Sequence, residues 1–131
     1  MLGVDTNVLV RFVTRDDPTQ ARRARAAVMD AAMRGDRLFV DAIVLCELVW
    51  VLRSAYGQPR EKICAVLAAM LSTPELVIED KDLARRALRD YQAGQGGFAD
   101  AFIGHRNHRS GCEATLTFDK RRGGHALFRS P

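Results

Sequence analysis

The chain has 131 residues, of which 47% are hydrophobic and 27% charged, and its formal net charge is +4 at pH 7. Such a chain can build its core without a metal or a disulfide, so we expect a single domain over residues 1–131. No run approaches the roughly 20 apolar residues that span a bilayer, and the first residues lack the basic segment of a secretory signal, which predicts a cytoplasmic protein without a membrane anchor.

The predicted elements alternate between strands and helices. In chain order they are a strand at 2–5, helices at 6–15 and 18–33, a strand at 37–40, helices at 42–55 and 60–72, a strand at 75–79, helices at 81–93 and 98–109, and strands at 114–118 and 126–129. Pro18 suits the first turn of a helix, and Asp41 is a good N-cap. This alternation predicts an α/β fold with a mainly parallel sheet, whose ligands bind beyond the carboxyl ends of the strands.

One predicted helix raises a question about a charge. The stretch AIVLCELVWVL, residues 42–52, is apolar apart from Glu47. Its length and composition predict a buried helix, in which an ionised carboxylate costs several kcal/mol unless something compensates it. We therefore expect Glu47 to face a polar site while its apolar neighbours pack away from that site.

Three further acids occupy comparable positions. Asp5 and Asp119 each end a predicted strand, and Asp100 lies among apolar residues in the predicted helix 98–109. Together with Glu47 they would form an acidic pocket at the carboxyl edge of the sheet, where a divalent cation would relieve their repulsion. Oxygen ligands favour Mg²⁺ or Mn²⁺, as one or two ions. Taken singly, each acid also has a structural interpretation, as a helix cap, a turn residue or the partner of a buried arginine.

With these residues in view, the chain resembles the PIN-domain ribonucleases, and most closely the VapC-type toxins of bacterial toxin–antitoxin pairs. The resemblance rests on four segments in the family's order, VDTNVLVR, ELVWVL, FADAFI and TFDK, and extends over nearly the whole chain. It implies a three-layer α/β/α sandwich with a four- to five-stranded, mainly parallel sheet. It also implies metal-dependent cleavage of RNA.

The resemblance assigns roles to particular residues. Asp5 and Asp100 would be the most direct metal ligands, and Glu47 and Asp119 would bind metal through water or activate the nucleophile. Asn7 and Thr117 would be supporting polar groups. The resemblance also implies a homodimer, which a small antitoxin silences by covering the active site. An additional acid, Asp41, is assigned to helix capping.

Basic residues are expected at the rim of an acidic pocket that receives RNA. The best candidates for phosphate contacts are Arg11 and the run after Asp119, KRRGGH, which includes Lys120, Arg121 and Arg122. An ordinary solvated loop is the alternative for that run. His105 and His108 lie one helical turn apart, but further zinc ligands are not evident. Cys46, Cys64 and Cys112 are far apart and are expected to be free thiols, buried or half-buried.

Two other functions stay open from the sequence. A Mg²⁺-dependent phosphatase could use Asp5 as a nucleophile, although VDTN lacks the second aspartate of the D-x-D pattern. A PIN-like scaffold could instead bind RNA or a partner protein without cutting. The presence of all four acids argues against that scaffold.

Overall fold

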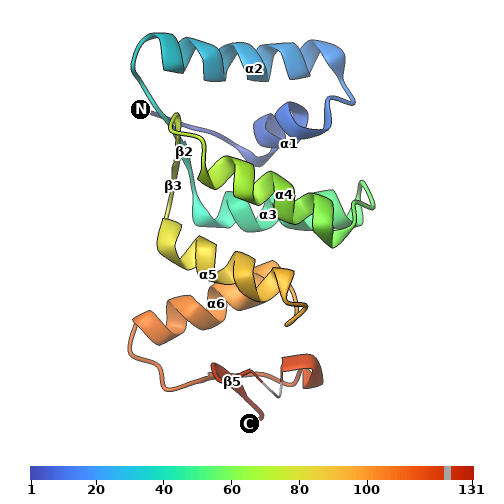
Figure 1. Cartoon of the computed structure of the whole chain (residues 1–131), viewed down its shortest axis with the longest axis vertical. Coiled ribbons are helices and arrows are strands. Elements are labelled where there is room, and N and C mark those ends of the chain that lie inside the picture. Colours follow the sequence, from blue (N-terminus) through green and yellow to red (C-terminus); the bar gives the residue numbers. More distant parts are fainter. Residues whose placement is uncertain (123–124) are drawn as a thin grey trace. The chain divides into compact units, whose positions relative to one another are not determined.

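A computed structural model of the chain describes residues 1–122 and 125–131 (Figure 1). The chain divides into two compact units, Met1–Lys81 and Asp82–Pro131. The first unit contains β1 (Leu2–Gly3), α1 (Thr6–Thr14), α2 (Pro18–Met33), β2 (Leu38–Val40), α3 (Ala42–Ser54), α4 (Arg60–Leu71) and β3 (Leu76–Ile78). The second contains α5 (Lys81–Gln92, which begins one residue before the boundary), α6 (Phe98–Arg109), β4 (Thr115–Leu116), the 3₁₀ helix η1 (Lys120–Arg122) and β5 (Phe128–Arg129).

All strand pairs of the described residues are parallel, which confirms the predicted α/β class. The first unit has a three-stranded sheet in the order β1-β2-β3, in which Leu2 pairs with Leu38 and Leu38 with Leu76. The second unit has a two-stranded sheet of β4 and β5. The five predicted strands are therefore present, but they are short and are paired as two sheets rather than one.

The core of the first unit lies where its helices meet the sheet. In this unit α1 packs against α2 and α3, and α3 packs against α4. Figure 1 shows the first of these contacts, with α1 and α2 side by side. Val40, Leu48, Leu52 and Ile63 have no exposed surface, so the sheet and both inner helices share one apolar interior. No described helix has the length and apolar character that crossing a bilayer requires.

The apolar spacing of α5 correctly predicts its inner face. Leu83, Ala84, Ala87, Leu88 and Tyr91 are all buried, and the Tyr91 ring meets Phe98 of α6 edge-on. The three cysteines are free, as expected, but Cys112 is exposed rather than half-buried.

Candidate functional site

Asp5 and Glu47 are both hydrogen-bonded to Thr6, the first through the backbone N–H and the second through the hydroxyl. Asp5 is the N-cap of α1, and its Oδ1 accepts a hydrogen bond from the backbone N–H of Thr6 at 2.7 Å. The Thr6 side chain is buried, and its Oγ1 donates to Glu47 Oε2 at 3.3 Å. One residue thus holds the carboxylate that follows β1 and the carboxylate on α3 in a fixed relation.

Parallel pairing explains why these side chains meet. Because β1 and β2 are adjacent parallel strands, the helices that follow them begin at the same edge of the sheet. Asp41 caps α3 there by accepting from Ile43 N at 2.7 Å, which confirms its predicted capping role. Glu79, after β3, accepts from Ala42 N at 2.8 Å, a second cap that the sequence analysis missed. Asp41 and Glu79 bond to the first turn of α3, whereas Thr6 bonds to both Asp5 and Glu47, so we take Asp5 and Glu47 as the acid pair of this unit.

The prediction that α3 is a buried helix is wrong for one of its faces. Leu45, Leu48, Val49 and Leu52 are buried, but Glu47 is exposed. Two large apolar residues of the helix are exposed as well, Ile43 at 66% and Trp50 at 69%. Composition alone suggested a buried helix, whereas the real helix has a core face and an outer face, and Glu47 lies on the outer one at low desolvation cost.

In the second unit, Arg122 connects Asp100 and Asp119. Asp100 lies in the first turn of α6, and Asp119 follows β4. The Arg122 Nη2 forms an ion pair with Asp100 Oδ2 and approaches Asp119 Oδ2 at 3.4 Å. Thr117 Oγ1 accepts from Asp119 N at 3.0 Å and so orients the turn that carries Asp119. These two acids are therefore close enough to share one cation.

The guanidinium of Arg122 is largely enclosed. Its side chain is 12% exposed, and its Cζ lies 5.3 Å from the centre of the Phe128 ring. Its Nε is buried and has no hydrogen-bond partner in the part of the chain that the structure describes. Burial lowers the pKa of Arg122. The Gly96 backbone runs alongside, since a Cβ at that position would lie 3.5 Å from Arg122 Nε. Arg122 is thus an internal partner of the acid pair rather than a free contact for phosphate.

The other predicted basic contacts have different environments. Arg121 Nη2 pairs with Asp119 Oδ2 at 2.8 Å, and its hydrogen bond is the main reason that the pKa of Asp119 is lowered. Arg11 Nη1 pairs with Asp16 at 2.9 Å. Lys120 is exposed. Gly123 and Gly124, the glycines of the KRRGGH run, lie outside the described residues. Asn7 is exposed in the first turn of α1 and lines a cavity that is described below.

The donor chemistry of the two acid pairs fits a hard divalent cation. Every candidate ligand is a carboxylate or hydroxyl oxygen, the ligand type that Mg²⁺ and Mn²⁺ prefer, and sulfur and nitrogen are absent from both described pairs. Arg122 shows that the pair of Asp100 and Asp119 already accommodates a positive charge. Asp5 and Glu47 belong to the first unit and Asp100 and Asp119 to the second, so each unit holds one pair.

A second cluster, which the sequence analysis missed, joins two histidines to an aspartate. The Oδ2 of Asp90, on α5, lies 2.7 Å from His105 Nε2 and 3.0 Å from His125 Nε2. These three residues could in principle hold a metal ion. However, Leu127 N–H donates to His125 Nδ1 at 3.1 Å, so the neutral ring carries its proton on Nε2, facing Asp90. A metal-bound histidine has the opposite arrangement, with its second nitrogen donating. The cluster is therefore a hydrogen-bonded link between α5, α6 and the segment before β5.

Sequence signals differ in strength for the residues whose contacts the sequence analysis did not foresee. Thr6 lies inside the DTN motif and could have been weighed with Asp5 and Asn7. Arg122 lies three residues after Asp119 within a basic run, which gives no sign that its side chain folds back. Asp90 and His125 are 35 residues apart, and only the tertiary structure brings them together.

Comparison with known proteins gives two results. Residues 3–123 match the family model described as the PIN domain, so the match extends across both units. The chain is also similar to a VapC ribonuclease of Aquifex aeolicus (strain VF5). The two sequences are 27% identical over 118 residues, which cover 90% of this chain and 87% of the relative.

Proposed function

The chain belongs to the PIN-domain family, and from that premise we propose that it is a metal-dependent endoribonuclease acting as the toxin of a toxin–antitoxin pair. The observation that carries the proposal is the grouping of its four acids in two pairs. Thr6 bonds to Asp5 through its backbone N–H and to Glu47 through its hydroxyl, and Arg122 pairs with both Asp100 and Asp119. The similarity to a VapC ribonuclease supports RNA as the substrate and an antitoxin as the partner.

The residues have distinct roles in this proposal. Asp5 and Asp100 would hold the metal directly, and Glu47 and Asp119 would hold it through water or accept a proton from the attacking water. Thr6 positions Glu47, and Thr117 positions Asp119. A bound Mg²⁺ or Mn²⁺, as one or two ions, supplies charge stabilisation at the phosphoryl oxygens and lowers the pKa of water. Hydrolysis forms a bond between the water oxygen and phosphorus and breaks the bond to the leaving ribose oxygen, which takes up a proton.

A homodimer and a cytoplasmic location belong to the same proposal. The exposed side chains of Ile43 and Trp50 on α3 support a contact with another protein chain, because large apolar residues that share an exposed helix face are common in interfaces. Because Glu47 lies between Ile43 and Trp50 on the same exposed helix face, the proposed occupant of this face is the antitoxin, which would cover the acid pair as well. The homodimer is proposed from the resemblance to VapC-type toxins alone.

Amide substitutions test the catalytic assignment. Asp5→Asn retains a good N-cap for α1, and Asp100→Asn keeps the shape of its side chain, so both should fold normally and lose at least about a hundredfold in RNA cleavage. Asp30→Asn on α2 and Asp82→Asn on α5 are matched controls, because both acids are exposed and have no proposed role. Full cleavage by Asp5→Asn and Asp100→Asn would overturn the proposal.

Metal removal separates the competing functions. Cleavage of a single-stranded RNA should stop in EDTA and return with Mg²⁺ or Mn²⁺. A phosphatase would instead hydrolyse a small phosphate monoester and leave RNA intact. A non-catalytic scaffold would bind RNA without cleaving it under any of these conditions.

A further inference from the structure

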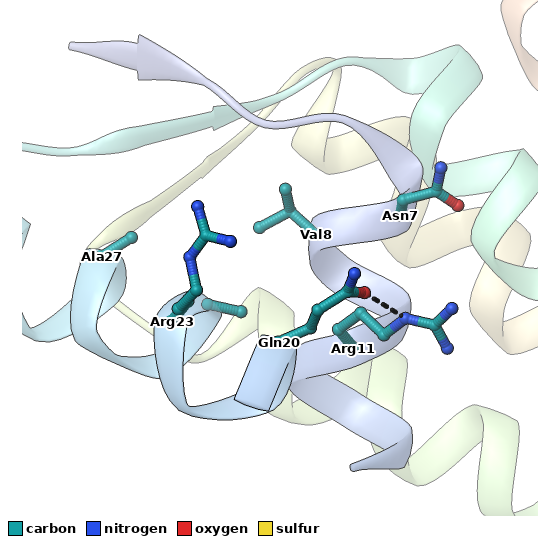
Figure 2. A pocket seen from close by; sticks show the side chains of 7 residues that line it. Asn7, Val8, Arg11, Gln20, Arg23 and Ala27 are labelled. Atoms are coloured by element: carbon teal, nitrogen blue, oxygen red, sulfur yellow. Dashed lines mark hydrogen bonds between the residues drawn. The ribbon is translucent and has the colours of Figure 1, made fainter. Parts of the chain in front are cut away.

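A cavity between α1 and α2 offers a second binding region in the first unit. Its volume is about 380 Å³, near the lower end of the range for small-molecule sites. Figure 2 shows Asn7, Val8 and Arg11 reaching it from α1, and Gln20, Arg23 and Ala27 from α2. None of the four acids lines it, although Asn7 and Arg11, which the sequence analysis expected near the site, do.

The hydrogen bonds at the rim leave donors free toward the cavity. Arg11 Nε donates to Gln20 Oε1 at 2.7 Å, and this bond orients the Gln20 amide so that its two N–H groups stay available (Figure 2). Among the described residues, the side chains of Asn7 and Arg23 have no hydrogen-bond or ion-pair partner. Arg11 itself is neutralised by Asp16 and contacts the Tyr56 hydroxyl at 3.2 Å. The cation left for a ligand is therefore Arg23.

The floor of the cavity is apolar. Val8, Ala24 and Ala27 form it with small side chains, and Ala24 is buried against α1. A ligand that fits this lining has a flat apolar face and several hydrogen-bond acceptors, at least one of them anionic. A nucleotide combines a base with phosphate and ribose oxygens and matches both requirements. A peptide matches less well, because its backbone N–H groups would need acceptors that the rim scarcely offers.

The position of the cavity relates it to the acid pair of the same unit. Asn7 lies two residues after Asp5 in the first turn of α1, about 3 Å further along the helix axis. Asn7 therefore links the turn that Asp5 caps to the lining of the cavity, so a nucleotide next to a scissile phosphate at Asp5 would have this rim within reach. We propose that the cavity between α1 and α2 binds one nucleotide that flanks the cleavage point, with Arg23 on its phosphate and Asn7 and Gln20 on its ribose or base. This inference rests on the proposed ribonuclease function and adds a substrate-binding site to it.

Two pairs of variants test the cavity, and each pair has a matched control on α2. Arg23→Gln removes the free cation, whereas Arg22→Gln removes an equal charge one residue away, outside the cavity. Ala27→Phe fills the cavity without changing charge, whereas Ala26→Phe adds the same bulk at an exposed neighbour that does not line it. Circular dichroism and thermal unfolding would verify that all four variants fold.

The measurement is binding of a short fluorescein-labelled single-stranded RNA of mixed sequence, by anisotropy in EDTA so that no cleavage occurs. Arg23→Gln and Ala27→Phe should each weaken binding by roughly tenfold, and Arg23→Gln should lower the slope of log affinity against log salt by about one. The Arg22→Gln and Ala26→Phe controls should bind like the wild type. Equal losses in Arg23→Gln and Arg22→Gln, or unchanged binding by Ala27→Phe, would overturn the site.

The same experiment separates this inference from the proposed function. If the wild-type protein binds and cleaves RNA and Ala27→Phe binds RNA equally well, the nucleotide site in the cavity is refuted and the ribonuclease function stands. If RNA binding depends on the cavity but the protein does not cleave RNA in Mg²⁺ or Mn²⁺, the ribonuclease function is refuted and the binding site stands. If Ala27→Phe binds RNA normally but escapes inhibition by the cognate antitoxin, the cavity receives a protein segment and the nucleotide site is wrong.

Discussion

Arg122 forms an ion pair with Asp100 through the same Nη2 atom that lies 3.4 Å from Asp119, so one side chain occupies the space between two predicted metal ligands. The relationship has an energetic consequence. A cation that binds these carboxylates must displace the guanidinium or share them with it. Arg122 therefore competes with the metal, and it stabilises the acid pair against repulsion when no metal is bound.

Replacing this arginine should strengthen metal binding. We expect Arg122→Gln to raise the affinity for Mn²⁺ by roughly threefold to tenfold, the effect of removing a competing ion pair worth about 1 kcal/mol. Electron paramagnetic resonance of free Mn²⁺ measures this without any turnover. Arg121→Gln is the control, because Arg121 is 77% exposed and Asp119 is its only ion-pair partner among the described residues. An equal gain in both variants would mean that general charge, and not the bridging position, sets the affinity.

Thr6 should matter more for activity than for stability. Thr6→Val keeps the β-branched shape in a buried position but removes the donor to Glu47 Oε2. The loss of one hydrogen bond should reduce the free energy of unfolding by about 1 kcal/mol. The turnover number should fall by at least about tenfold, because Glu47 loses its orientation. Thr6→Ser, which restores the hydroxyl, should recover turnover; no recovery would exclude a positioning role for that hydroxyl.

The ionisation of Asp16 should report on the contact between the α1–α2 loop and the end of α3. The hydrogen bond from the Tyr56 hydroxyl is the largest of several causes that lower the pKa of Asp16 from 3.8 to about 2. Because the folded-state pKa is the lower one, the stabilisation is complete above the unfolded value near 3.8 and is lost as the pH falls toward about 2.

Tyr56→Phe should move the pKa of Asp16 back toward its ordinary value, and carbon-detected NMR titration would measure that shift. Thr14→Val should have a smaller effect, since the Thr14 hydroxyl is the second cause. A larger shift in Thr14→Val than in Tyr56→Phe would contradict this ranking of the causes.

A side chain at Gly104 should weaken the contact between α6 and β5 and so lower the free energy of unfolding. A Cβ added there would lie 2.7 Å from Phe128 Cζ, closer than real carbon contacts allow. Alanine gains about 1 kcal/mol of helix propensity over glycine, but overpacking costs roughly 1–3 kcal/mol. Gly104→Ala should therefore lower the free energy of unfolding by up to about 2 kcal/mol. Phe128→Leu in the Gly104→Ala background should restore part of the loss. Chemical denaturation measures both, and a stabilised Gly104→Ala protein would show that β5 moves freely away from α6.

The order of elements followed from the sequence, and the four acids of the proposed site were named from it. Strand and helix positions were recovered within a few residues because short apolar runs, caps such as Asp41 and punctuating glycines are local signals. Membership of the PIN-domain family followed from four motifs in order, and the family match over residues 3–123 confirms it. The outer face of α3 did not follow, because an apolar composition does not reveal which side of a helix meets the core.

Only the tertiary structure decided which partners the charged groups have. The hydroxyl of Thr6 reaches Glu47 across 41 positions of sequence, and Asp90 reaches His125 across 35. Arg122 folds back onto Asp100 and Asp119 instead of extending toward solvent. These partners depend on burial and on the direction in which each side chain points once the helices have packed. The local sequence pattern predicts neither. The sequence therefore determined which residues could form a site, and the packing decided which of them are already paired with one another.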